Sequence, residues 1–159
     1  MITFLTGWRG KRLHSNSLVV GINTLGELPP LFWCVQGQEE LVILSEALGE
    51  NQPIYGMRSL SNISGKNQSH TKPLAKQYAR ELLELKPEGD FNLGGFCEGG
   101  SFIFEVAMEL QNKGRHISLL CLHDRFVENK YSGRVVFFFC QDSMSSLYLF
   151  IFVLELVWY

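Results

Sequence analysis

The letters GFCEG at residues 95–99 stand where two stretches with different hydrophobic patterns meet. Residues 90–96 form a short run that predicts a strand, and residues 98–112 repeat apolar side chains at helical spacing. Gly95 and Gly99 stand two positions before and after Cys97. Because glycine has no side chain, it lets two elements approach closely. The sequence therefore predicts a strand that turns sharply into a helix at Cys97.

The rest of the chain alternates between the same two patterns. Gly49 is expected to end one helix as a left-handed cap, and Pro73 to open another. Strands that alternate with helices indicate an α/β fold, with a mostly parallel sheet and helices on both faces. Short apolar runs predict strands and helical spacing predicts helices as follows: strands at residues 18–22, 31–35, 53–57, 117–122 and 134–139, and helices at residues 39–48 and 73–85.

Composition and charge narrow the class of protein. The 159 residues are 46% hydrophobic and 19% charged, which is typical of a globular domain with a sizeable core. A net charge of -2 provides no basic surface, so we expect neither nucleic acid nor a membrane as a partner. The four cysteines lack CxxC spacing and no signal peptide is evident, which indicates reduced thiols in a cytoplasmic protein.

The two ends of the chain differ from its middle. We expect an N-terminal tail at residues 1–17, a partial α/β domain at residues 18–143 and an aberrant apolar tail at residues 144–159. The last 13 residues read LYLFIFVLELVWY, which is shorter than the roughly 20 residues that a membrane-spanning helix needs. The alternatives for this apolar end are a buried strand or helix, and an aggregation-prone segment with nothing to cover it.

The turn at residues 95–99 has the form of a nucleophile elbow, G-x-S-x-G, with sulfur in place of oxygen. Such a turn presents its central side chain and directs backbone N–H groups toward an oxyanion. The N–H of Glu98 is the natural first donor. Cysteine attacks as the thiolate, which a helix N-terminus stabilises and the neighbouring carboxylate of Glu98 opposes. The alternative is that Cys97 only fills space at the turn.

Three further phrases accompany the elbow: PPLF at residues 29–32, QPIYGM at residues 52–57 and KPEG at residues 86–89. They occur in the order found in the thioesterase domains that end nonribosomal peptide and polyketide synthetases. Residues 31–140 resemble this family, which has the α/β-hydrolase fold. The resemblance implies that residues 18–143 form a partial thioesterase domain.

The resemblance also implies roles for single residues. Cys97 takes the place of the family's usual serine nucleophile, and Asp124 takes that of the triad acid, at the end of the strand after the elbow helix. The second oxyanion donor would be Gln36 or Gly37, where the family often has a histidine and several glycines. A solvent-facing aspartate at a strand end is the alternative for Asp124.

Two departures from the family concern the lid and the base. The family has a helical lid after the acid-bearing strand, but only residues 125–130 intervene here, so the expected fold lacks the lid and the C-terminal part. The family's triad histidine follows the last strands, and no histidine follows His123. The four histidines are expected to be surface residues rather than the base: His14, His70, His116 and His123.

These observations leave several functions open. The first hypothesis is a thioesterase or acyl transferase that releases acyl or peptidyl chains from the phosphopantetheine of a carrier protein. It would need no cofactor or metal of its own. The second is a non-catalytic module that binds a carrier protein or an acyl group, and the third is a truncated product without activity. A general small-molecule hydrolase is also compatible, because fold and elbow do not choose the acyl donor.

Overall fold

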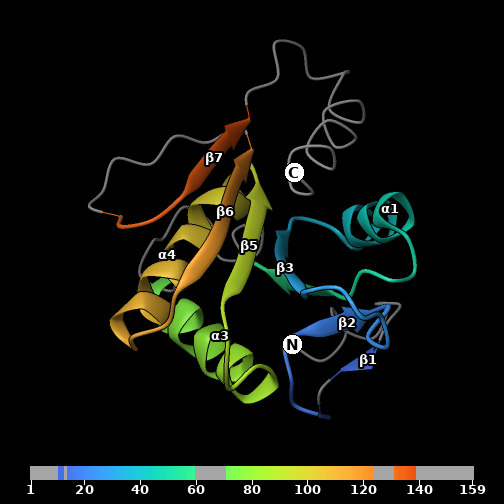
Figure 1. Cartoon of the computed structure of the whole chain (residues 1–159), viewed down its shortest axis with the longest axis horizontal. Coiled ribbons are helices and arrows are strands. Elements are labelled where there is room, and N and C mark those ends of the chain that lie inside the picture. Colours follow the sequence, from blue (N-terminus) through green and yellow to red (C-terminus); the bar gives the residue numbers. More distant parts are fainter. Residues whose placement is uncertain (1–10, 13, 60–70, 124–130, 139–159) are drawn as a thin grey trace.

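A computed structural model of the chain describes residues 11–12, 14–59, 71–123 and 131–138. The described residues form a sheet with helices packed on it (Figure 1). The strands are β1 (Lys11–Arg12), β2 (Val20–Ile22), β3 (Leu31–Val35), β4 (Ile54–Arg58), β5 (Phe91–Phe96), β6 (Ile117–His123) and β7 (Val135–Phe138). The helices are α1 (Gln38–Leu48), α3 (Thr71–Leu85) and α4 (Glu98–Asn112).

The strands are hydrogen-bonded in the order β1-β2-β4-β3-β5-β6-β7. Pairing is parallel from β4 through β3, β5 and β6 to β7, and antiparallel where β2 joins β4 and where β1 joins β2. The mostly parallel sheet predicted from the sequence is therefore confirmed. The antiparallel edge was not predicted, because a short strand carries no signal for the direction of its partner.

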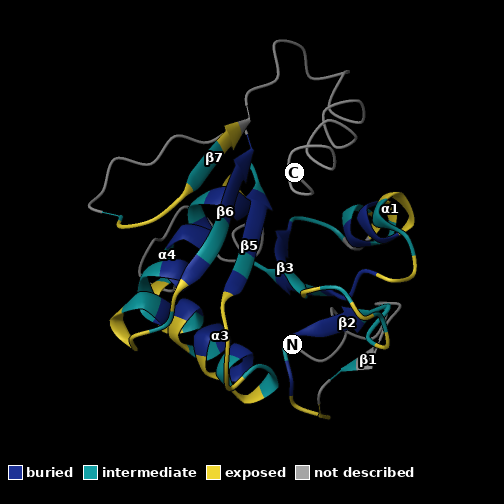
Figure 2. Ribbon diagram, in the orientation of Figure 1, coloured by how far each residue is buried: buried dark blue, intermediate teal, exposed yellow. Residues whose placement is uncertain are grey.

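Alternation along β3 divides the core between the two faces of the sheet. Phe32 and Cys34 belong to the larger apolar cluster, which includes side chains of α3 and α4. Trp33 and Val35 belong to a smaller cluster on the opposite face, together with Leu41 and Leu44 of α1. Because successive side chains of a strand point to opposite faces, β3 serves both clusters. The prediction of helices on both faces is confirmed, and Figure 2 shows the central strands buried between them.

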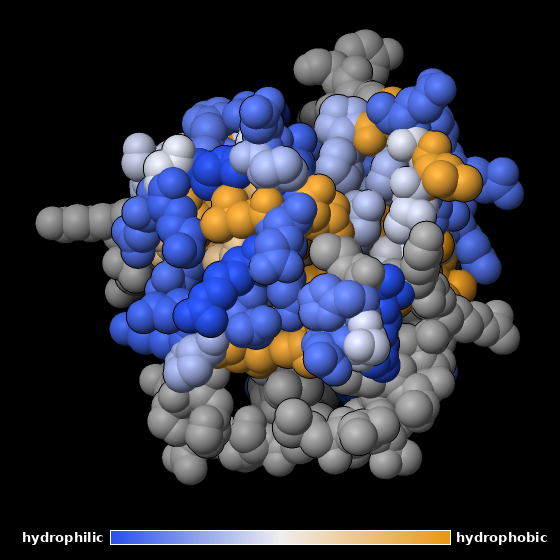
Figure 3. Space-filling model, turned by 90° about the horizontal axis from the view of Figure 1, so that it is seen from below, coloured by the Kyte–Doolittle hydropathy of each residue, from blue (hydrophilic) through white to orange (hydrophobic). Residues whose placement is uncertain are grey.

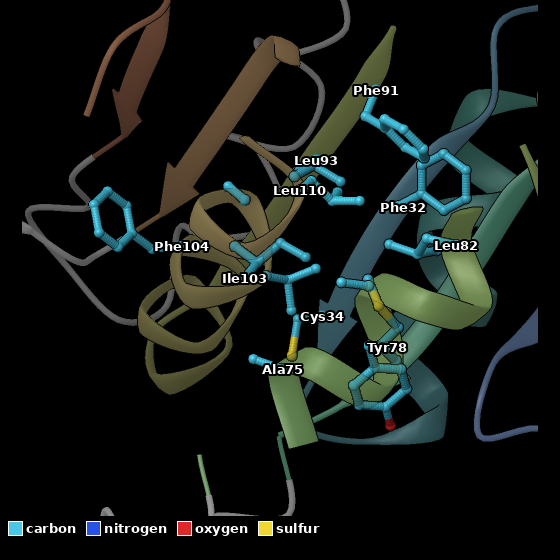
Figure 4. Packing of buried hydrophobic residues seen from close by; sticks show 14 of the residues in the cluster. Phe32, Cys34, Ala75, Tyr78, Leu82, Phe91, Leu93, Ile103, Phe104 and Leu110 are labelled. Atoms are coloured by element: carbon cyan, nitrogen blue, oxygen red, sulfur yellow. The ribbon is translucent and has the colours of Figure 1, made fainter. Parts of the chain in front are cut away.

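The larger cluster joins the sheet to the paired helices α3 and α4. Figure 4 shows Cys34 of β3 near Ala75 of α3 and Ile103 of α4. All three side chains have 0% exposure. On the face of the molecule shown in Figure 3, apolar residues form small groups between hydrophilic ones. Three large hydrophobic side chains are exposed in the described ranges, namely Leu25, Ile43 and Phe137.

The ends of the helices agree with the predictions in part. Helix α4 has the predicted bounds, whereas α3 begins at Thr71, two residues before Pro73. A proline in the first turn is tolerated because its missing N–H has no helical acceptor there. Gly49 follows α1 with φ 82° and ψ 169°. The predicted positive φ is present, but the extended ψ means that the predicted left-handed cap was wrong.

Part of the predicted N-terminal tail is built into the fold. Strand β1 pairs with β2, and Ser17 has 0% exposure. The Ser17 hydroxyl donates to Oε2 of Glu81 in α3 at 2.6 Å, and the Leu18 N–H donates to the same oxygen at 3.0 Å. This contact joins residues more than 60 positions apart, so no local pattern in the sequence indicates it.

Several predicted features lie outside the described residues. They are the loop that carries His70, the acid Asp124, the short connection at residues 125–130 and the apolar tail at residues 144–159. Where the chain is described, no helix combines the length and apolar content needed to cross a membrane.

Candidate functional site

The link between β5 and α4 has the geometry of a nucleophile elbow. Cys97 has φ 50° and ψ -117°. A positive φ is uncommon for a residue that is not glycine, and it stores strain that the surrounding structure must hold. This conformation turns the chain from the last residue of the strand directly into the helix. The sharp turn predicted at Cys97 is confirmed.

The two glycines of the motif are required by close packing. A Cβ on Gly95 would lie 2.6 Å from the backbone carbonyl of Gly99. A Cβ on Gly99 would approach the carbonyl oxygen of Cys34 in β3 closer than the 3.0 Å below which real Cβ contacts are essentially never found. Both obstacles are backbone atoms, which cannot turn aside as a side chain can. The strand and helix therefore meet only without side chains at these positions.

Hydrogen bonds hold Cys97 between α4 and β6. Its N–H donates to the carbonyl oxygen of His123 at 2.8 Å, and its own carbonyl accepts from the N–H of Gly100 at 3.0 Å. Helix α4 begins at Glu98, so the first amides of the helix have no helical acceptor. These amides and the helix dipole favour negative charge near the Cys97 side chain.

Exposure distinguishes Cys97 from the other described thiols. Cys34 and Cys121 are buried, whereas Cys97 is half-buried. Burial raises the pKa of the Cys34 thiol well above its ordinary value and that of Cys121 to about 12. Within the described ranges, Cys97 is therefore the thiol that a reagent in solution can reach most easily.

Cys97 lies at the topological switch point of the sheet. Strands β3 and β5 are neighbours and run parallel, with Cys34 opposite Gly95. The chain leaves β3 for α1, which packs on one face, and leaves β5 for α4, which packs on the other. Diverging connections of this kind open a crevice at the carboxyl ends of the two strands, where α/β proteins bind ligands. Residues 36–37 and Cys97 lie at these two ends.

The loop after β3 is held by a half-buried carboxyl group. The N–H of Gln36 donates to Oε2 of Glu40 at 3.0 Å, and the indole Nε1–H of Trp33 donates to Oε1 of Glu40 at 2.8 Å. Burial raises the pKa of Glu40, and these two hydrogen bonds partly oppose that shift. The Gln36 amide, one of the two predicted oxyanion donors, is thus already engaged.

Further bonds link this loop to its neighbours. The side-chain Nε2 of Gln36 donates to the carbonyl oxygen of Phe96 at 3.4 Å, and Nη2 of Arg58 donates to the carbonyl oxygen of Gln36 at 3.2 Å. Gly37, the other predicted donor, has φ -136° and no atom within 4 Å of the place of a Cβ. Its N–H makes no hydrogen bond within the described part of the chain.

The described histidines differ in how far they are exposed. His116 precedes β6, at the end of the strand far from Cys97, with Nδ1 2.9 Å from Oδ2 of Asp90 and a side chain that is 71% exposed. It is a surface residue as predicted, and so is the exposed His14. His123, however, is 3% exposed and lies against Phe96, with ring centroids 4.7 Å apart. Its predicted surface position was wrong because β6 continues through His123, in register with Phe96.

The predicted acid follows the last residue of β6, but Asp124 itself lies outside the described residues. Sequence reasoning did not single out Glu40, Trp33 or Arg58. A glutamate in the first turn of a predicted helix can reach back to an amide before the helix, and this signal could have pointed to Glu40. In the described ranges, no group of three or more His, Cys, Asp or Glu side chains could hold a metal ion.

Comparison with known families identifies the family to which this elbow belongs. The family model described as thioesterase domain matches residues 51–133, just over half of the chain. This chain belongs to the thioesterase domain family. The match includes β5, the elbow and α4. The resemblance inferred from the sequence phrases is therefore confirmed.

Similar proteins are large synthetases. This thioesterase domain is 29% identical over 129 residues to a dimodular nonribosomal peptide synthase of Bacillus subtilis (strain 168), covering 74% of the chain and 5% of that protein. It is 32% identical over 111 residues to chondramide synthase cmdD of Chondromyces crocatus, covering 68% of the chain and 3% of that protein. The chain thus spans a small part of these relatives.

A solved structure has a similar fold. The crystal structure of the NocB thioesterase domain, in a covalent complex with a fluorophosphonate nocardicin G analog, matches with a TM-score of 0.57 at 21% identity. The match covers 68% of this chain and 49% of that one. The mostly parallel sheet with helices is therefore that of the thioesterase α/β-hydrolase domains, over about half of their length.

Proposed function

We propose that this thioesterase domain takes an acyl or peptidyl chain from a phosphopantetheine thioester, with Cys97 as the nucleophile. The observation that carries the proposal is the strained backbone of Cys97, with φ 50°, between β5 and the N-terminus of α4. A cysteine that only filled space would not need this conformation, because an ordinary turn avoids the strain.

The first step is an exchange of one thioester for another. The Sγ of Cys97, as a thiolate, attacks the carbonyl carbon and forms a new C–S bond. The carbonyl oxygen becomes an oxyanion, stabilised by the N–H groups of Glu98 and of Gly37 or Gln36. Collapse of the intermediate breaks the C–S bond to the phosphopantetheine, whose sulfur leaves as a thiolate and takes a proton from water.

The second step transfers the acyl group from Cys97 to water or to another nucleophile. An attacking hydroxyl must lose a proton, so this step needs a general base. In our proposal Asp124 is the triad acid, whose role is to orient the histidine that serves as the base in the family. The 159-residue chain has no histidine after His123, so we expect its acyl enzyme to hydrolyse slowly.

The partner in this proposal is an acyl or peptidyl carrier protein, which brings the substrate on its own phosphopantetheine. The domain itself holds no resident cofactor, and it works in the cytoplasm beside the carrier. Support comes from the relatives, which are named as peptide and polyketide synthases. Proteins of that kind carry their growing chains as thioesters on carrier domains.

The test is the capture of an acyl enzyme. The chain is mixed with an acyl-pantetheine thioester, or with an acylated carrier protein, and its intact mass is followed. We expect the mass to rise by one acyl group, located on Cys97 by peptide analysis, and the Cys97→Ala variant to remain unchanged. An unchanged mass of the wild-type chain, with carrier binding still measurable, would instead support a non-catalytic binding module.

A further inference from the structure

One carboxyl group joins the loop after β3 to β3 itself. Glu40 accepts two hydrogen bonds, one on each oxygen: from the indole of Trp33 at 2.8 Å and from the N–H of Gln36 at 3.0 Å. The two donors lie on opposite sides of the end of β3, one within the strand and one in the loop that follows it. The carboxyl group therefore fixes where the strand ends and how the loop leaves it.

Both donors also contact β5. The Trp33 ring packs on Gly94 so closely that a Cβ at Gly94 would overlap its six-membered ring. The Gln36 side chain donates to the carbonyl oxygen of Phe96, the residue before Cys97, at 3.4 Å. Glu40 is thus connected, through Trp33 and through Gln36, to β5, the strand that ends just before Cys97.

The loop between β3 and α1 contains two residues, Gln36 and Gly37. The Gln36 N–H is taken by Glu40, and Nη2 of Arg58 holds the Gln36 carbonyl from the side of β4 at 3.2 Å. The hydroxyl of Tyr78 in turn accepts from the N–H of Arg58 at 3.0 Å and donates to its carbonyl at 3.1 Å. With Gln36 held on both sides, Gly37 supplies the amide of this loop that can serve an oxyanion.

We infer that Glu40 is a positioning residue for acyl transfer, which holds the loop against the elbow so that the N–H of Gly37 is the second oxyanion donor. The inference rests on the proposed function. It assigns Glu40 an effect on steps that form an oxyanion and none on the intrinsic reactivity of the thiol.

Two reactions of Cys97 separate this role from a merely structural one. Acylation by an acyl-pantetheine thioester passes through an oxyanion, whereas alkylation by iodoacetamide is a direct displacement at carbon and does not. Glu40→Gln keeps the shape of the side chain but replaces one acceptor oxygen by a donor. Glu39→Gln is the matched control, because Glu39 is the exposed neighbour of Glu40 in the first turn of α1.

We expect Glu40→Gln to slow acylation of Cys97 by about 10-fold or more, since loss of one oxyanion donor costs roughly 100-fold and a displaced donor part of that. Alkylation should stay within about twofold of the wild-type rate, and Glu39→Gln should match the wild type in both reactions. Trp33→Phe removes the indole N–H that donates to Glu40, and it should show the same selective loss of acylation. It provides a second test if Glu40→Gln does not fold.

Three results would overturn the inference. If the variants acylate as fast as the wild type, the loop does not depend on Glu40. An equal fall in acylation and alkylation would mean that Glu40 only supports the fold. If the wild-type chain is alkylated at Cys97 but never acylated, the proposed function itself fails, and that failure is visible without any variant.

Discussion

Gly99 lies where α4 passes over β3, and the backbone of Cys34 occupies the place of its missing side chain. We predict that Gly99→Ala destabilises the domain by about 1–3 kcal/mol, as overpacking of a close contact does. The measurement is the midpoint of urea unfolding. Gly37→Ala is the control, because Gly37 has a negative φ and no atom within 4 Å of its Cβ position. Equal midpoints for the two variants would show that α4 can move away from β3 at little cost.

Helix α3 is tied to the segment before β2 by Glu81, which is 2% exposed. Its carboxyl oxygens accept from Ser17, from Leu18 and, at 3.1 Å, from Nε2 of Gln77. An amide at this position has only one acceptor oxygen, so Glu81→Gln leaves a buried donor without an acceptor. We predict a loss of about 1–3 kcal/mol in the free energy of unfolding, together with faster hydrogen exchange at the Leu18 amide.

The matched control in α3 is Glu84→Gln, since Glu84 is exposed on the same helix. That substitution should change the free energy of unfolding by less than about 0.5 kcal/mol. A Glu81→Gln variant as stable as Glu84→Gln, with unchanged exchange at Leu18, would mean that the edge of the sheet is held by β1 and β2 alone.

The two apolar clusters of the whole molecule meet at β3, so we expect them to unfold together. Cys34 reports on the larger cluster and Cys121 on the smaller one. In native buffer both should react with iodoacetamide at least about 100-fold more slowly than Cys97, because a free energy of unfolding near 5 kcal/mol keeps unfolded chains rare. With rising urea, pulse labelling read by peptide mass should show both thiols becoming reactive at one concentration.

Labelling of Cys121 at clearly lower urea than Cys34 would contradict that prediction. It would mean that α1 and its cluster open while α3 and α4 remain packed. In that case the loop at residues 36–37 belongs to a separately unfolding part of the molecule.

The sequence by itself determined most of the elements and the turn that joins β5 to α4. Strand β3 and helix α4 have the predicted bounds, because a short apolar run and a helical apolar period are local properties that each segment carries. The spacing of Gly95, Cys97 and Gly99 predicted the elbow for the same reason. The roles of Cys97, Asp124 and the oxyanion donors remain predictions, and Asp124 lies outside the described residues.

Only the tertiary structure decided which distant groups meet. The antiparallel edge, the burial of Ser17 on Glu81 and the contact of the His123 ring with Phe96 all join residues far apart in the chain. The carboxyl of Glu40 could be expected to cap its own helix, but its bond to the Trp33 indole depends on how β3 packs beside β5. Such contacts follow from the order of strands in the sheet, which no local period specifies.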